Sequence, residues 1–453
     1  MSQLKQIIIV GAGLSGLTLA LALTDPKFQT ATPFHVTLYE LRARDYHHGG
    51  AIMLSPNSLR LYDKLGVYDH LKTLGYNFEK NTMTLDSPEL VSGTNVIGPN
   101  PSHPQLRTGE YLFGAEAMFG YQGLRIYRQV IIDALFTILD ARPNLTLVFS
   151  KQYTHVVSET ESDVTIAFAD GDTAAADLLI GTDGIHSKIR SYVVNDDSIS
   201  PKYTGIMSVV GAVSTALADP AHPESITGPI SVSGASGVYV IAPQGPTGSD
   251  LMAGTQIAYT EQDQAGWRAL MNDGLRMKAL QEAGRASWAS PLVKNAIEHI
   301  KPESMYVWPF YMVPEVPSWI SRMGKVIIIG DAAHALPPTL GQGANQAVED
   351  AYSLVALLTG LESAKENGRV SANAIPTAVR QWQHKRQERV DRLKAMTAKM
   401  NNNRLPAAQK EGMSADQFWA PDPERPGEEM RWLYDDDIEG MIQGIFEGRW
   451  RVE

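Results

Sequence analysis

A glycine pattern near the start of the sequence constrains the fold more than any other feature. Gly11, Gly13 and Gly16 follow residues 7–10, a β-branched run that is typical of a buried parallel strand. In this spacing the first glycine permits a tight turn, the second lets a phosphate approach the backbone, and the third lets a helix pack on the strand. The leucine-rich residues 14–23 predict that helix, with free N–H groups at its start. The pattern predicts a β-α-β nucleotide-binding unit.

The second strand of this unit is predicted at residues 36–40, and it ends in Glu40. In dinucleotide-binding units an acidic residue about 20 positions beyond the glycines binds a ribose, and the loop 25–33 lengthens that interval here. A glycine-rich turn without a ligand is the alternative interpretation. It does not account for the strand, the helix and Glu40 together.

A second glycine-rich motif lies far along the chain. The apolar residues 325–329 predict a buried strand that leads into Gly330 and Asp331. The run Gly341-Gln342-Gly343-Ala344-Asn345 follows and places backbone N–H groups at the start of a helix. Together the two motifs suggest one cofactor that is held by two distant segments.

Composition excludes several classes of protein. The 453 residues suffice for two domains, and the absence of cysteine excludes disulfides, thiolate catalysis and cysteine-ligated metals. A net charge of −11 disfavours nucleic acid as a partner. No apolar run reaches the ~20 residues of a membrane span, and no signal peptide is visible, so we expect a cytoplasmic protein. His47-His48 lacks a third ligand, so no metal site is predicted.

The pattern of apolar runs and turns suggests three regions. Residues 1–75, 110–200 and 320–365 are expected to form a discontinuous nucleotide-binding domain. Residues 76–109 and 201–319 read as a second domain with a mixed sheet, and residues 366–453 as C-terminal helices and a tail. The expected fold class is therefore α/β.

A third motif, Asp183-Gly184, follows the predicted buried strand at residues 178–182. With all three motifs in order, the chain resembles the single-component FAD-dependent aromatic hydroxylases, of which para-hydroxybenzoate hydroxylase and salicylate hydroxylase are familiar members. The resemblance covers roughly residues 5–400. It implies a Rossmann-type FAD-binding domain, an interleaved mixed-sheet substrate domain and a C-terminal helical region.

The resemblance also implies roles for individual residues. The glycine loop would hold the FAD pyrophosphate, Glu40 the adenosine ribose and Asp331 the ribityl chain. Asp183 is linked to both FAD and the nicotinamide cofactor, with a structural turn as an equal alternative, and His334 is expected to be structural. The implied cofactor-binding residues are Gly11, Gly13, Gly16, Glu40, Gly50, Ala51, Arg128, Asp183, Asp331, Gly341, Gly343, Ala344 and Asn345.

The implied reaction is monooxygenation. NADPH or NADH would reduce FAD, and O₂ would add to give a flavin hydroperoxide that hydroxylates or epoxidises a small organic molecule. One alternative is a reductase or oxidase of the same fold. Another is a membrane-docked flavin-binding protein that uses a basic stripe at Arg380, Lys385, Arg389, Arg392 and Lys394. The assembly is expected to be a monomer or a homodimer.

One departure from the family concerns the substrate. Salicylate-hydroxylase-like members carry an arginine where this chain has Val210. An arginine suits an anionic substrate, so its absence favours a neutral, bulky molecule such as an alkaloid, terpenoid or polyketide of secondary metabolism. Tyr239 is the catalytic candidate, as a phenol that could hydrogen bond to substrate. Further candidates for the pocket are Trp308, Phe310, Met312 and Pro337.

Overall fold

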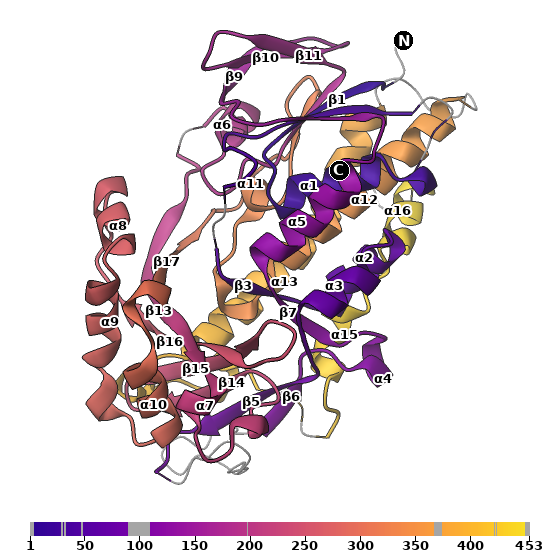
Figure 1. Cartoon of the computed structure of the whole chain (residues 1–453). Coiled ribbons are helices and arrows are strands. Elements are labelled where there is room, and N and C mark those ends of the chain that lie inside the picture. Colours follow the sequence, from indigo (N-terminus) through magenta and orange to yellow (C-terminus); the bar gives the residue numbers. More distant parts are fainter. Residues whose placement is uncertain are drawn as a thin grey trace.

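A computed structural model of the chain describes residues 4–28, 30, 33–46, 49–88, 109–196, 198–366, 374–420, 422 and 424–448. Two sheets dominate it, and Figure 1 shows them at opposite ends of the molecule with long helices between and beside them. His47 and His48 lie outside the described residues. The architecture confirms the predicted α/β class.

The first sheet has five parallel strands. In spatial order they are β18 (Val326–Ile328), β12 (Leu178–Gly181), β1 (Gln6–Val10), β2 (His35–Tyr39) and β8 (Leu145–Val148). Strands that are covered on both faces are continuous apolar runs rather than alternating ones, and β1, β12 and β18 follow this rule. This explains why the sequence identified β1, β12 and β18 correctly.

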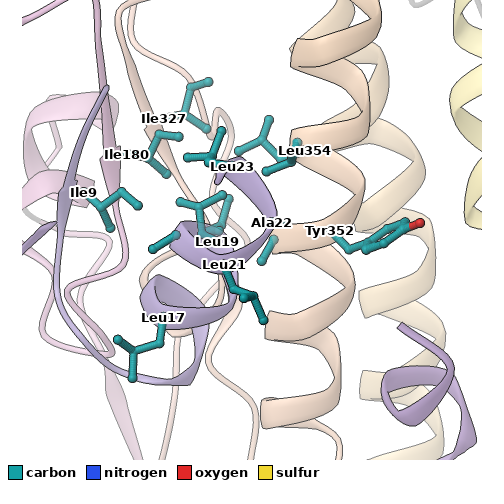
Figure 2. Packing of buried hydrophobic residues seen from close by; sticks show 14 of the residues in the cluster. Ile9, Leu17, Leu19, Leu21, Ala22, Leu23, Ile180, Ile327, Tyr352 and Leu354 are labelled. Carbon is teal, nitrogen blue, oxygen red and sulfur yellow. The ribbon is translucent and has the colours of Figure 1, made fainter. Parts of the chain in front are cut away.

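Three helices pack together beside this sheet: α1 (Leu14–Leu23), α5 (Arg128–Leu139) and α12 (Gly343–Glu366). All ten residues of α1 are buried. Figure 2 shows its Leu19 and Leu23 near Ile180 and Ile327 of the strands and near Leu354 of α12. The antiparallel strands β9 (Tyr153–Glu159), β10 (Val164–Phe168) and β11 (Thr173–Ala176) lie on the other side with α6 (Lys188–Val194) (Figure 1).

The second sheet has seven strands and is mixed, since β14 and β5 pair in parallel. In spatial order the strands are β17 (Tyr306–Met312), β13 (Lys202–Ser214), β16 (Asp250–Ala258), β15 (Gly237–Gln244), β14 (Ile230–Gly234), β5 (Lys80–Leu85) and β6 (Gly109–Leu112). Helices α7 (Thr215–Ala218), α8 (Gln264–Met271), α9 (Gly274–Glu282) and α10 (Pro291–His299) cover one face. The helical stretch of residues 267–283 is divided between α8 and α9 at Asn272 and Asp273.

A small antiparallel sheet lies between the two large ones in Figure 1. It comprises β3 (Ala51–Leu54), β7 (Gly123–Tyr127) and β4 (Tyr76–Phe78). Two helices, α2 (Pro56–Lys64) and α3 (Tyr68–Leu74), follow β3. The leucines at positions 59, 61, 65 and 71 have a spacing that would suit one helix over residues 58–75. The chain breaks it at Gly66, whose φ of +74° ends a helix at little steric cost.

Strand pairing bears on the proposed regions. Residues 76–78 fall in the proposed second domain, yet they pair with the small sheet. Residues 110–112 fall in the proposed nucleotide-binding domain, yet they pair with the seven-stranded sheet. The interleaving itself is visible, because β5 and β6 come from a segment between parts of the first unit. The exact division into domains stays a proposal.

The C-terminal region consists of the long α13 (Ala374–Asn403) followed by α14 (Ala407–Lys410), α15 (Glu428–Tyr434) and α16 (Ile438–Phe446). Its predicted basic stripe is largely occupied by neighbours. Arg389 is buried against Glu349, and the Arg392 guanidinium lies 3.9 Å from the ring centroid of Trp432. Lys385 pairs with Glu388. Arg389 is thereby paired inside the protein, whereas Arg380 and Arg392 stay exposed, so the membrane-docking alternative stays a prediction.

Candidate cofactor and active site

The glycine loop joins β1 to α1 and leaves one side open. A Cβ on Gly11, which has a φ of +109°, would lie 2.4 Å from the carbonyl oxygen of Thr182. A Cβ on Gly16 would lie 1.9 Å from the carbonyl oxygen of Gly11. Gly13 meets only the Arg128 guanidinium, at 3.5 Å. The outer glycines therefore serve packing, while Gly13 faces the space into which α1 directs its uncapped N-terminus.

Glu40 lies beside this loop, immediately after β2. Its carboxylate accepts a hydrogen bond from the backbone N–H of Ala12 at 2.7 Å and another from that of Arg42 at 2.9 Å. The backbone N–H of Gly11 also donates to the carbonyl of Tyr39 at 2.8 Å. These bonds fix the carboxylate next to the glycine loop, where a ribose-binding acid is expected.

Arg128 begins α5 and crosses the same space. Its side chain passes within 3.5 Å of the position of a Cβ on Gly49, and its backbone N–H donates to the carbonyl of Gly50 at 3.2 Å. The Nε atom is buried and has no hydrogen-bond partner among the described residues. Arg128 thus joins the glycine loop of β1 to the loop that precedes β3.

Asp331 closes the opposite side of this space. Gly330 has a φ of +60° and turns the chain after β18, and the Asp331 side chain stays accessible while the four residues that follow are buried. Desolvation by the surrounding protein raises the pKa of Asp331, whereas electrostatic interaction with His334 and Arg128 lowers it. A Cβ on Gly343 would lie 3.9 Å from its carboxylate. Asp331, Arg128, Gly13 and Gly343 therefore border one space.

Residues 341–345 lead into α12 and are held by the Asn345 side chain. Its amide donates to the carbonyls of Gly341 at 2.7 Å and Met53 at 3.1 Å. Its Oδ1 accepts from the backbone N–H of Ser55 at 2.9 Å. The side chain of Asn345 is fully buried, so it orders the loop around Gly341, whose φ is +63°. Ala344 is half-buried beside it.

Asp183 lies behind the glycine loop rather than in front of it. Its Cα is 3.2 Å from the position of a Cβ on Gly11. One carboxylate oxygen accepts from the backbone N–H groups of Lys188 at 2.9 Å and Ile189 at 3.2 Å. Burial raises the pKa of Asp183, and the hydrogen bonds to it act in the opposite direction. These bonds describe a structural turn, and a role toward FAD or the nicotinamide cofactor stays a prediction.

His334 belongs to a buried ionic network. Its Nε2 lies 2.6 Å from a carboxylate oxygen of Asp350, which also accepts from the backbone N–H of Gly330 at 2.9 Å. The guanidinium of Arg386 donates to the other oxygen of Asp350 at 2.8 Å and also pairs with Glu349. Because this network holds the Gly330 turn, the predicted structural role of His334 agrees with its contacts.

The network predicts a pH dependence of stability. Burial alone would raise the pKa of Asp350, but His334 and Arg386 lower it to about 2. The folded pKa lies below the unfolded value of about 3.9. The stabilisation, on the order of 2 kcal/mol, is therefore complete above about pH 5 and is lost as the pH falls toward 2.

Urea unfolding at pH 7, 5, 4 and 3 should show that acid lowers the free energy of unfolding less for Asp350→Asn than for the wild type. Equal losses would contradict this assignment, and Asp172→Asn, at an exposed position, is the control.

The seven-stranded sheet turns one face toward the small sheet and the other toward α8–α10. Val210, Gly254, Val240 and Tyr306 are in register and share the first of these faces. The hydroxyl of Tyr306 lies 2.4 Å from the position of a Cβ on Gly50, so this face reaches the loop before β3.

Other predicted pocket residues differ in their exposure. Trp308 lies on the same face as Tyr306, two residues along β17, and is 43% exposed. Phe310 and Pro337 are buried, and Met312 is half-buried. The roles of these residues in a substrate pocket stay predictions.

The structure places Tyr239 on the wrong face for the predicted catalytic role. Its side chain is fully buried between the sheet and the helices, where its ring packs edge-on against Trp288. Its hydroxyl donates weakly to Gln281 at 3.4 Å, and burial raises its pKa strongly. Side chains alternate along β15, so Val240 faces the small sheet instead of Tyr239.

Two residues near the site were not predicted from the sequence. Tyr306 approaches Gly50, and Arg125 of β7 extends to Met252 of β16. Neither lies in a motif. A buried-strand pattern that contains an arginine, as residues 123–127 do, was the one available signal for Arg125.

Comparison with known proteins decides the family. The sequence matches the FAD-binding domain family over residues 5–374. The chain belongs to this family. It is 25% identical over 397 residues to the FAD-dependent monooxygenase penE of Penicillium thymicola, covering 85% of this chain and 76% of that one. It is 28% identical over 361 residues to 6-hydroxynicotinate 3-monooxygenase of Bordetella bronchiseptica, covering 79% and 84%.

The fold of this flavoprotein also matches solved structures. A salicylate hydroxylase substrate complex superposes with a TM-score of 0.72, at 21% identity and 98% coverage of both chains. Together with the family match, these relatives confirm FAD as the cofactor and an FAD-dependent monooxygenase as the class of enzyme.

The residues of this chain fit FAD. Arg128 has an orphaned, buried Nε, and Asp331 makes no hydrogen bond to a described residue. A carboxylate is an acceptor for ribityl hydroxyls, and a guanidinium donates to phosphate or carbonyl oxygens. Gly13 and Gly343 leave the space between these two side chains free of a Cβ.

Within the described ranges, no group of three or more histidine or acidic side chains could hold a metal ion. None of the helices in the described part of the chain is long and apolar enough to cross a bilayer. The expected cytoplasmic location and the monomeric or homodimeric state stay predictions.

Replacing Asp331 by alanine should weaken FAD binding about 10- to 100-fold, because a hydrogen bond that involves a charged group is lost. Equilibrium dialysis of FAD, followed by flavin absorbance, measures this. Asp331→Asn keeps an acceptor oxygen and should bind FAD with intermediate affinity. Unchanged FAD content in Asp331→Ala would show that the carboxylate does not hold the cofactor. Asp172→Ala, at an exposed position, is the control.

Proposed function

We propose that this flavoprotein uses NADPH or NADH and O₂ to hydroxylate or epoxidise a bulky aromatic or polycyclic molecule. The observation that carries the proposal is the convergence of Gly13, Arg128, Asp331 and Gly343 on one space next to the seven-stranded sheet. When bound, FAD supplies the redox chemistry and activates O₂. The protein must bind the substrate, orient it and exclude water.

The chain holds FAD from both ends. Glu40 and the N-terminus of α1 suit the adenosine ribose and the pyrophosphate. Asp331 suits the ribityl chain, and the N–H groups at the start of α12 suit the edge of a ring that gains negative charge on reduction. Tyr306 extends from the sheet to the loop of Gly50, and it marks the side of the site on which the substrate binds.

The sheet face beside this site supports a large substrate. Five of its residues have short or absent side chains, and Met252 and Tyr306 are the larger ones in register with them: the short ones are Val210, Ala212, Val240, Ala242 and Gly254. A Cβ on Gly254 would lie 2.2 Å from the carbonyl oxygen of Val209, so this position excludes any larger residue. The Bordetella bronchiseptica relative is named for a small substrate, 6-hydroxynicotinate. Without an arginine at position 210, a small aromatic acid fits this chain poorly.

A screen for compounds that accelerate NADPH or NADH oxidation tests this proposal. Holoenzyme is mixed with paired small and polycyclic aromatic compounds, and nicotinamide oxidation is followed at its absorbance maximum. Polycyclic compounds should raise the rate more than salicylate does. Stimulation by salicylate alone would contradict the proposed substrate size. Comparison of the two nicotinamide cofactors in the same assay decides the reductant.

A further inference from the structure

Arg125 is a buried arginine without an anionic partner. It lies at the centre of β7 and is 5% exposed. One guanidinium nitrogen donates to the sulfur of Met252 at 3.0 Å, and Nε has no partner among the described residues. A thioether is a weak acceptor. Arg386, by contrast, pairs with both Glu349 and Asp350.

The surroundings of Arg125 place it at the substrate side of the site. Met252 is in register with Ala212 and Ala242 and thus lies on the sheet face that also carries Val210 and Tyr306. Arg125 pairs through its backbone with Met53 of β3. The guanidinium therefore lies between the strand that follows the Gly50 loop and the sheet face proposed to contact the substrate.

The ionisable neighbours of Arg125 are phenols, not carboxylates. Burial lowers the pKa of Arg125, and Tyr306 and Tyr127 act in the opposite direction. Burial also raises the pKa of both tyrosines, so they are neutral at neutral pH. A buried cation without a counter-charge is unfavourable unless a ligand supplies the missing negative charge. The described chain provides no such anion at this position.

We propose that Arg125, with Tyr306 beside it, binds an oxyanion of the substrate: a carboxylate, a phenolate or an enolate. This rests on the proposed function, because it assigns a specificity-determining residue to that site. It also revises the expectation of a neutral substrate, which depended on Val210 alone. Val210 of β13 stands where salicylate-hydroxylase-like members have an arginine, and Arg125 places a guanidinium on β7 instead. The substrate is therefore bulky and carries an acidic oxygen.

The test compares two ligands of one shape, naphthalene-2-carboxylate and naphthalene-2-carboxamide. Their binding to the FAD-loaded enzyme is followed by the perturbation of the flavin absorbance. The wild type should bind the carboxylate about 10- to 100-fold more tightly, as expected for a charge-assisted hydrogen bond. Arg125→Met should reduce this preference to about twofold or less, and Arg125→Lys should retain part of it. FAD affinity should stay within about twofold in both variants.

A thermal melt of the ligand-free holoenzyme separates this role from a structural one. Because Arg125→Met removes an unpaired buried charge, its melting temperature should equal or exceed that of the wild type. A lower melting temperature with an unchanged carboxylate preference would overturn the proposal. Absence of any preference in the wild type would overturn it as well, as would loss of FAD, which would assign Arg125 to the cofactor. If Arg125→Met does not fold, Arg125→Gln is measured in its place. Arg268→Met, at an exposed position on α8, is the matched control.

The ligand-binding test and the oxygenation assay can fail separately, so the role of Arg125 and the proposed reaction are distinguishable. Loss of the carboxylate preference in a variant that still consumes O₂ would support both proposals. Retention of the preference with normal O₂ consumption would overturn only the role of Arg125. A wild type that binds FAD but oxygenates no compound would overturn the proposed function, whatever ligands it prefers.

Discussion

Gly16→Ala is expected to give a protein that is strongly destabilised and free of FAD. A Cβ at this position would lie 1.9 Å from the carbonyl oxygen of Gly11 and 2.7 Å from the hydroxyl of Thr182. The first neighbour is backbone, and that hydroxyl is held by the carbonyls of Val10 and Gly11. Neither can move without separating α1 from β1. We expect a loss of about 3 kcal/mol or more in the free energy of unfolding, at the upper end of the range for overpacking.

Urea unfolding and FAD content measure the two effects of this substitution. Gly284→Ala is the matched control, because its Cβ would lie 3.7 Å from its nearest neighbour and its φ is −91°. That variant should keep both its stability and its FAD. If Gly16→Ala purified as a fully yellow protein with the wild-type unfolding midpoint, the assigned packing of α1 on the glycine loop would be wrong.

Arg386→Met is expected to destabilise the fold by about 3 kcal/mol, the lower end of the range for breaking a buried ion pair. It removes the cation shared by two buried carboxylates, while Glu349 keeps Arg389 and Asp350 keeps His334. Arg386 is 1% exposed and pairs with Glu349 and Asp350, both fully buried. Asp350 in turn accepts from the backbone N–H of Gly330. We therefore expect FAD affinity to fall as well, since the turn that presents Asp331 loses its support.

Chemical unfolding followed by far-ultraviolet circular dichroism measures the loss, and FAD titration measures the effect on the cofactor. Arg380→Met lies on the same helix at an exposed position and is the control. It should change the free energy of unfolding by less than about 0.5 kcal/mol. Similar unfolding midpoints for the two variants would show that the network contributes little to stability.

The sequence predicted the parts of the site that depend on local backbone geometry. Gly11, Gly13 and Gly16 require a strand before them and a helix after them, and both are visible in a few consecutive residues. Gly330 and Asp331 follow a buried strand in the same way. The fold class follows from these motifs, because three parallel strands of the first sheet, β1, β12 and β18, are almost entirely apolar.

The sequence could not predict contacts that join distant strands. Both faces of β15 are covered, so periodicity alone did not show that Tyr239 faces the helices and Val240 the small sheet. Arg125 meets Met252 across a long stretch of chain, and no local pattern announces that pairing.

The position of Arg386 in the sequence indicates that its side chain is buried. It occupies the apolar stripe of α13, between Trp382 and Val390, and all three are buried. A charged residue at such a position indicates a buried partner. The partners Glu349 and Asp350 lie on α12, where the sequence offered no matching cue.

Isotope labelling determines whether this flavoprotein inserts oxygen from O₂ into an organic substrate. Holoenzyme turns over a stimulating compound under ¹⁸O₂ with NADPH or NADH, and the product is analysed by mass spectrometry. We expect one ¹⁸O atom in each product molecule and one nicotinamide oxidised for each O₂ consumed. Turnover without O₂, or hydrogen peroxide as the sole fate of O₂, would identify a reductase or an oxidase of the same fold and contradict the account.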